Sequence, residues 1–136
     1  MTPTLVAQEI AEQYSDSGLR DLKAIQGEWI VTKVVRGGQR LKIDVGQQAI
    51  HRITADKWIP GRNPEDFTRL KLNGDTTPAQ VDMIDLDGLK MLGVYRLNGD
   101  DLIFVISRPG QPRPAELVSE NGSPTYSMEF KRRTKD

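Results

Sequence analysis

The chain has 136 residues, with 19 basic and 19 acidic side chains, which is the size of one domain with no formal net charge. The absence of cysteine excludes disulfides, zinc–thiolate sites and a thiol nucleophile, and a single histidine excludes a multi-histidine metal site. Because the charges balance, no general attraction draws the chain to nucleic acid or to an anionic membrane, and we expect neither as a partner.

The N-terminal part predicts two short helical stretches. Residues 5–14 carry an apolar stripe at helical spacing, formed by Leu5, Val6, Ile10 and Tyr14. Residues 15–18 interrupt it, and Ser17 is the expected N-cap of a second stretch over residues 19–25, which Gly27 ends. We therefore assign residues 1–20 to an N-terminal helical extension and residues 21–136 to one further domain.

The first residues have neither the basic start nor the apolar stretch of a secretory signal. No run approaches the ~18 apolar residues of a transmembrane helix. The sequence therefore predicts a cytoplasmic protein. A chain from which a signal had been removed would look the same, and the lack of cysteine does not exclude export.

From residue 29 onward the pattern is typical of short antiparallel strands. Residues 29–35 are rich in β-branched residues, and residues 50–59 form a broken strand with a turn at Ala55-Asp56. Apolar and polar residues alternate over residues 67–72, 81–86, 91–97 and 125–132, and residues 102–107 are almost wholly apolar. Turn dipeptides separate several of these segments: Gly37-Gly38, Ala55-Asp56, Asn73-Gly74, Asp87-Gly88 and Asn98-Gly99. Residues 108–114 contain three prolines and must form an extended loop. The sequence therefore predicts an antiparallel barrel or sandwich.

Alternation along the first and last strands predicts which side chains face the core. In the last strand one face carries Tyr126, Met128, Phe130 and Arg132. In the first strand one face carries Trp29, Val31, Lys33 and Val35. If the face with Trp29 is the inner one, Lys33 points inward.

The sequence Gly27-Glu28-Trp29 after a helical turn, with Arg132 late in the last strand, is similar to the calycin pattern of lipocalins and fatty-acid-binding proteins. In that superfamily the Trp lies at the closed end of the barrel and the Arg packs across its ring. The resemblance implies a lipocalin-like β-barrel of about eight strands. It also implies that Trp29 and Arg132 close the barrel through a cation–π contact of about 1–2 kcal/mol. A role for the pair in lining a ligand site is the less favoured alternative.

A closer resemblance covers residues 21–132. Residues 21–29, 93–102 and 109–117 resemble, in order, three motifs of an uncharacterised small-domain family abundant in planctomycete bacteria. The family brings no established chemistry. Its members often have a cysteine in the strand that here reads Ile103-Phe104-Val105, and many begin with an export signal; this chain has neither.

Three polar residues lie in strands whose alternate positions are apolar, and we expect them to line a ligand site: Lys33, Arg52 and Tyr95. An inward Lys33 would need an acid, a ligand or access to water, and the open alternative is that its side chain extends toward the barrel mouth and keeps the ammonium in water. The prolines around Arg113 predict an interaction loop, in which the guanidinium either meets an anion or partner, or pairs with a local acid such as Glu116. The pairing is favoured.

Other candidate sites are weaker. Asp82, Asp85 and Asp87 lack the spacing of a calcium loop and are expected at a solvated strand end. The sequence has no serine nucleophile motif for which His51 could act as the base. It also has no glycine-rich loop at the start of a helix, which a phosphate-binding site would need. The basic residues 131–135 are expected to be a solvated strand end. We therefore predict no catalytic residue, no metal and no cofactor.

The leading functional hypothesis is a non-enzymatic domain that binds a small, mostly apolar molecule inside the barrel. The alternative is a protein-interaction module or homo-oligomer with a filled barrel, acting through the proline-rich loop or the N-terminal helix. An enzyme ranks third, because no nucleophile, base and oxyanion site can be assembled from the sequence.

Overall fold

The computed structural model of the chain describes residues 15–43 and 50–133. Within these ranges one helix and nine strands follow in chain order: α2 (Asp16–Ala24), β1 (Gly27–Arg36), β2 (Gln39–Leu41), β3 (Ile50–Thr54), β4 (Lys57–Ile59), β5 (Thr68–Asn73), β6 (Ala79–Ile84), β7 (Lys90–Asn98), β8 (Asp101–Ser107) and β9 (Thr125–Arg132). The helix predicted over residues 5–14 lies outside the described residues.

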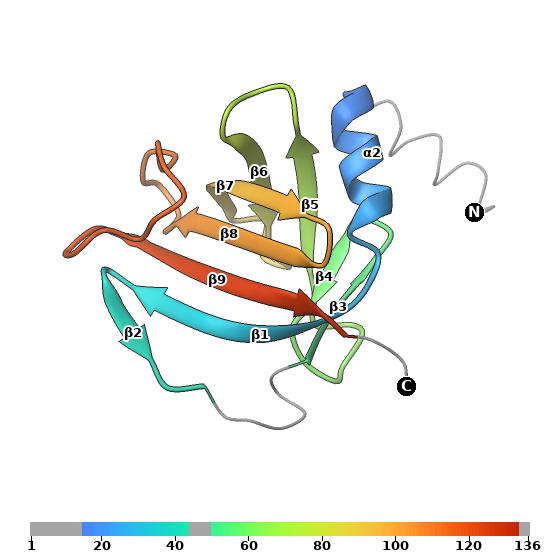
Figure 1. Ribbon diagram of the computed structural model, residues 1–136, viewed down its shortest axis with the longest axis horizontal. Helices are drawn as coiled ribbons and strands as arrows, with labels where there is room; N and C mark the ends of the chain where they lie inside the picture. The colour runs from blue at the N-terminus through green and yellow to red at the C-terminus, as the bar shows by residue number, and fades with distance from the viewer. Residues whose placement is uncertain (1–14, 44–49, 134–136) are drawn as a thin grey trace.

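The strands form a closed antiparallel barrel, as predicted. Each strand from β3 to β9 pairs with the next, and β9 pairs with β1 to close the ring (Figure 1). The first half of β1 pairs with β3 and its second half with β2. The ring therefore has eight strands, and β2 lies beside it as a short ribbon.

Most strands lie where alternation predicted them, and β9 has its predicted bounds. The strand β2 was not predicted. Its three residues are all exposed, so none of them carries the apolar alternation that burial imposes on a strand.

Helix α2 covers one end of the barrel, but its cap differs from the prediction. Ser15, not Ser17, is the N-cap: its Oγ accepts a hydrogen bond from the Gly18 N–H at 3.1 Å. Ser17 lies inside the helix, where its hydroxyl accepts from the Gly74 N–H in the β5–β6 turn at 3.0 Å. A side chain on Gly18 would collide with the Leu72 carbonyl of β5, so this glycine lets the helix approach the sheet closely.

The described part of the N-terminal segment belongs to the barrel. Helix α2 runs across the boundary predicted between residues 20 and 21, and Ser17 and Gly18, which precede that boundary, are buried against the end of β5 and the β5–β6 turn. No helix in residues 15–43 or 50–133 is long and apolar enough to cross a lipid bilayer.

A bulge in β1 reverses the predicted direction of Lys33. The pairing with β9 shifts register at Thr32, so the alternation that begins with an inward Trp29 continues with Val34 and not with Lys33. The prediction that Lys33 points inward is wrong, because the extra residue moves it to the opposite face. Its ammonium lies 3.6 Å from Glu129, and the Lys33 side chain is 43% exposed.

The interior is filled toward the end that α2 covers. Trp29, Tyr95 and Phe104 are almost fully buried there, at 2% exposure or less. At the other end of the barrel, the inward-facing Met91 and Tyr126 are only half-buried, and the Tyr126 hydroxyl lies 3.9 Å from the Met91 sulfur. Their strand neighbours Met83 and Ile106 are fully buried, so the core extends toward this end and only its outermost side chains are less covered.

The covered end is closed by the two residues that the calycin resemblance pairs. The guanidinium carbon of Arg132 lies 4.3 Å from the centre of the Trp29 ring. The same guanidinium donates hydrogen bonds to the carbonyls of Ala24 at 2.6 Å and Gln26 at 2.9 Å, and the Trp29 indole N–H donates to the Ile25 carbonyl at 2.9 Å. The carbonyls at and just beyond the C-terminal end of α2 are thus bonded to strand side chains.

Replacing Arg132 with alanine should lower the free energy of unfolding by about 2–3 kcal/mol, because two charge-assisted hydrogen bonds and a cation–π contact are lost. Urea denaturation of the full chain measures this. Arg133→Ala is the matched control, because its neighbouring guanidinium makes one exposed bond at 3.3 Å to Glu28 and should change stability by less than about 0.5 kcal/mol. Equal effects of the two substitutions would show that the closure contributes little.

Candidate functional site

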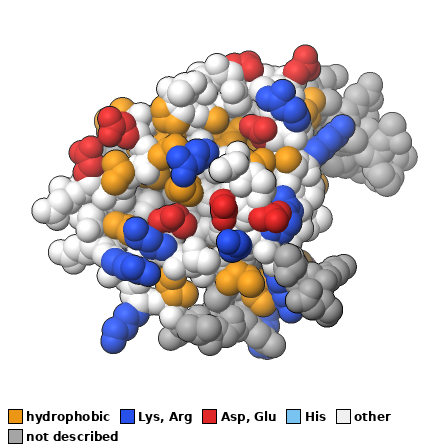
Figure 2. Space-filling model, viewed as in Figure 1, with side chains coloured by type: hydrophobic (Ala, Val, Ile, Leu, Met, Phe, Trp, Pro, Cys, Tyr) orange, Lys and Arg blue, Asp and Glu red, His pale blue; other side chains and the backbone are white. Residues whose placement is uncertain are grey.

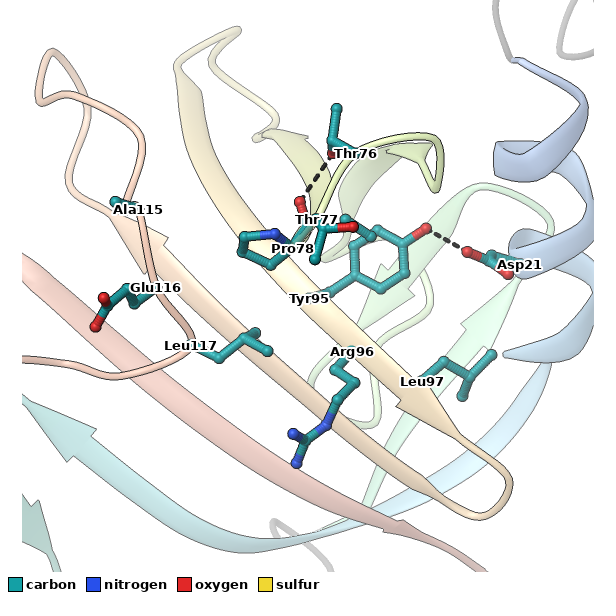
Figure 3. Close-up of a pocket in the computed structure, with 11 residues that line it drawn as sticks. Asp21, Thr76, Thr77, Pro78, Tyr95, Arg96, Leu97, Ala115, Glu116 and Leu117 are labelled. Carbon is teal, nitrogen blue, oxygen red and sulfur yellow. Dashed lines mark hydrogen bonds between the residues drawn. The ribbon is translucent and has the colours of Figure 1, made fainter.

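A cleft opens on the wall of the barrel where β6 leaves β7. The pairing of these strands ends with Ala79 opposite Tyr95, and residues 76–78 turn away from the sheet. Strand β7 continues to Asn98 and pairs there with β8 alone. The space left beside β7 is a cleft of about 470 Å³, which the loop after β8 closes on its far side (Figure 3).

The walls of this cleft are mostly apolar. They are formed by Pro78, Ala79, Leu97, Ala115 and Leu117. Three charged residues also line it: Asp21 approaches from α2, whereas Arg96 and Glu116 come from β7 and the loop and are exposed (Figure 3). Two hydroxyl side chains, Thr76 and Thr77, also line it, and no histidine, serine or lysine is among the lining residues.

The side chain of Tyr95 packs in the barrel core and also lines the cleft. Its ring is 2% exposed, and its hydroxyl donates a hydrogen bond to Asp21 Oδ2 at 2.5 Å. Burial, and then the bond to Asp21, raise the pKa of Tyr95, so the phenol keeps its proton and acts as the donor. Asp21 was not predicted as a site residue, because a single acid in a helical stretch has no distinguishing pattern.

Tyr95 is the only member of the predicted ligand set, Lys33, Arg52 and Tyr95, that lines the cleft. Arg52 lies in β3 opposite Glu28 and Ile59, and its guanidinium donates to the Arg62 carbonyl at 3.3 Å. Neither Arg52 nor Lys33 has a partner in common with Tyr95. The structure does not bring the three residues together as one site.

Arg113 fastens the proline-rich loop to the barrel wall. Its guanidinium contacts Asp82 at 2.7 Å and donates to the carbonyls of Val81 at 3.0 Å and Gly93 at 2.9 Å. Arg113 does pair with an acid, but the expectation that this acid is local in sequence, such as Glu116, is wrong: the partner is Asp82, 31 positions away on β6. The guanidinium is therefore occupied, and it anchors the loop that forms one wall of the cleft.

The acidic residues near the β6–β7 turn have structural partners. Lys90 lies 3.3 Å from Asp82, and the Asp85 carboxylate accepts hydrogen bonds from the N–H groups of Asp87 and Leu89, both at 2.9 Å. These bonds order the turn. Across the described part of the chain, no group of three or more acidic or histidine side chains is placed to hold a metal ion.

His51 lies inside the barrel as part of an aromatic cluster. Its Nδ1 accepts a hydrogen bond from the Trp58 indole N–H at 3.0 Å, and its ring stacks on Trp58 and meets the edge of Phe130. Burial lowers the pKa of His51 to about 4, so the ring is neutral at pH 7. Because the Nδ1 lone pair of this neutral ring already accepts the bond from Trp58, His51 has a packing role in the aromatic cluster.

The basic strand end is balanced by acids on neighbouring strands. Its ion pairs are Lys131 with Asp101 at 3.9 Å, Arg132 with Asp100 at 3.0 Å and Arg133 with Glu28 at 3.3 Å. Over the middle of the face in Figure 2, acidic and basic side chains are interspersed and do not gather by sign.

A scan against protein-family models, a search of curated proteins and a search of solved structures gave no match to this chain. The assignment of a function therefore rests on the geometry of the cleft and on the chemistry of its lining residues.

Replacing Arg113 with alanine should release the loop from the wall. We expect amide hydrogen exchange to accelerate by at least about tenfold over residues 109–120, while the strands stay protected, because three contacts to β6 and β7 are lost. Arg108→Ala, at the exposed start of the same loop, should leave exchange unchanged. A loop equally protected in both variants would contradict the anchoring role.

Stability should fall as pH drops from 6.5 to about 4, in part because of His51. The unfolded chain protonates this histidine near its ordinary pKa of 6.5, whereas the folded chain holds it neutral to about 4. The stabilisation is therefore complete above pH 6.5 and is lost through this window. The substitution His51→Gln keeps an acceptor for Trp58 without the titration. Urea denaturation should show that the variant loses about 1–2 kcal/mol less than the parent protein between these pH values. Parallel pH profiles would contradict this account.

Proposed function

We propose that this barrel is a non-enzymatic binding domain for a small, mostly apolar molecule, and that the molecule lies in the cleft beside β7. The observation that carries the proposal is the cleft itself. Its volume of about 470 Å³ falls within the range of about 300–1,000 Å³ typical of ligand sites. Its walls are apolar, and one hydrogen-bonded polar pair, Tyr95 and Asp21, lies at its inner end.

The filled core favours this cleft over the barrel interior that the sequence suggested. At the end covered by α2, a ligand inside the barrel would have to displace Trp29 or Phe104, which pack at interior density. The cleft requires no such displacement. An interior ligand would instead lie at the opposite end, beside the half-buried Met91 and Tyr126, where chemical shift mapping can detect it.

The relation to calycins, and to the planctomycete family, forms part of the proposal. It is supported by the three sequence motifs, by the closed eight-stranded barrel and by the contact between Trp29 and Arg132 at its covered end. Calycin barrels commonly bind apolar molecules, which is consistent with the proposed ligand class.

A protein-interaction module is the second candidate. The observation that favours it is a set of exposed apolar side chains on two rigid turns: Leu86 and Leu89 at the β6–β7 turn, and Val118 in the loop after β8. Light scattering of the full chain separates the two candidates, because a stable homo-oligomer would favour interaction and a monomer would favour the cleft.

Replacing Leu117 with alanine should weaken the binding of the neutral apolar dye Nile red about 3–10-fold, because an apolar wall of the cleft is removed. Val118→Ala is the matched control: Val118 follows it in sequence, is 49% exposed and does not line the cleft. Fluorescence titration gives both affinities, and thermal melting shows that both variants are folded.

Chemical shift mapping with the same dye locates the ligand independently. Shifts at Leu97 and Leu117 support the cleft. Shifts confined to Val34, Met91 and Tyr126 would instead place the ligand inside the barrel, and an absence of shifts and of dye binding would remove the proposed function.

A further inference from the structure

The inner end of the cleft holds a carboxylate whose charge is poorly neutralised. Asp21 has a side chain only 21% exposed, and it lines the cleft beside the Tyr95 hydroxyl. Its ion-pair partner among the described residues is Arg20, at 3.9 Å, and that side chain is 75% exposed. Such a long, solvated contact contributes little, so much of the Asp21 charge is uncompensated.

The carboxylate of Asp21 accepts hydrogen bonds and cannot donate, and two hydroxyls near it are already used as donors, whereas the Thr77 hydroxyl, which also lines the cleft, can donate or accept. The Tyr95 proton is already used in the bond to Asp21 Oδ2, and a carboxylate offers further lone pairs but no donor. The Thr76 hydroxyl is also committed, since it donates to the Pro78 carbonyl at 2.8 Å. A ligand group beside Asp21 must therefore bring its own donors, and a positive charge there gains the most.

The other charges of the cleft do not reverse this preference. Arg96 and Glu116 have opposite signs, both are exposed, and Figure 3 shows both away from the Tyr95–Asp21 bond. Exposed charges act weakly on a ligand because water screens them. The one half-buried charge is the carboxylate of Asp21.

We infer that the cleft selects an apolar molecule bearing a protonated amine, with the ammonium bound by Asp21 and the hydrocarbon part lying against Leu97 and Leu117. The inference rests on the proposed function and names its ligand class. The ammonium supplies the positive charge and the donors that the Asp21 carboxylate can still accept, and the apolar walls supply affinity for the remainder of the molecule.

Three probes of equal chain length test the inference: n-octylamine, n-octanol and n-octanoate, each titrated by calorimetry into the full chain at pH 7. We expect octylamine to bind about tenfold more tightly than octanol, and octanoate to bind most weakly. Asp21→Asn should remove the preference for octylamine over octanol while keeping the octanol affinity, because an asparagine oxygen still accepts from Tyr95. Glu116→Gln, at the rim of the same cleft, should leave the preference within about twofold.

The outcomes separate this inference from the proposed function. If octanol binds but octylamine binds no more tightly, or if octanoate binds best, the cleft is a ligand site and the inference is overturned. A preference that survives Asp21→Asn, or that Glu116→Gln removes, also overturns it. Thermal melting of both variants verifies folding, and if none of the three probes binds, the proposed function itself fails.

Discussion

The guanidinium of Arg132 joins β9 to two parts of the chain that are far from it in sequence, residues 24–29 and the β7–β8 turn. It lies on the Trp29 ring of β1, bonds the carbonyls at the end of α2 and pairs with Asp100 in the β7–β8 turn. Because one planar group meets all of these at once, the positions of the helix, the first strand and the last strand are fixed together. A lysine could not replace this side chain. Its ammonium has no planar group with two separate nitrogens that could lie on the Trp29 ring and donate to both carbonyls at once.

The cleft depends on that closure. Asp21 reaches Tyr95 because α2 lies across the end of the barrel, and α2 is held there by Arg132 at one end and by the Ser17–Gly74 contact near the other. The opposite wall depends on Arg113, which holds the loop against β6 and β7. A site assembled in this way has rigid walls although no single element contains it, and two of its walls are loops stabilised by buried polar contacts.

The sequence predicted those features that depend on local alternation and turn chemistry. Strand β9 and the turns at Gly37-Gly38 and Asn98-Gly99 follow from such patterns. It selected the wrong cap, Ser17 instead of Ser15, because both precede the same helical stretch and both can accept from a backbone N–H. The choice was made by tertiary contact, since Ser17 is needed by the β5–β6 turn.

Local sequence patterns could not predict the cleft, for a different reason. Its lining comes from α2, residues 76–79, β7 and residues 115–117, and no spacing in the sequence relates these segments. Tyr95 was found because a polar group in an apolar strand needs a partner, whereas its partner Asp21 carries no such sign. The salt bridge of Arg113 likewise crosses 31 positions of sequence, so the nearest acid in the sequence was not the nearest in space.

The bulge at Thr32 decides which face of β1 each later residue takes. Without the additional residue, the alternation from Trp29 would place Lys33 and Val35 on the inner face and Val34 on the outer one. With it, Val34 packs against the core, Arg36 follows on the same face opposite Tyr126, and Lys33 lies beside Glu129 on the outer face. The number of residues in β1, and not only their identity, thus determines which side chains meet the core, and a deletion of one residue would exchange the two faces of the strand beyond it.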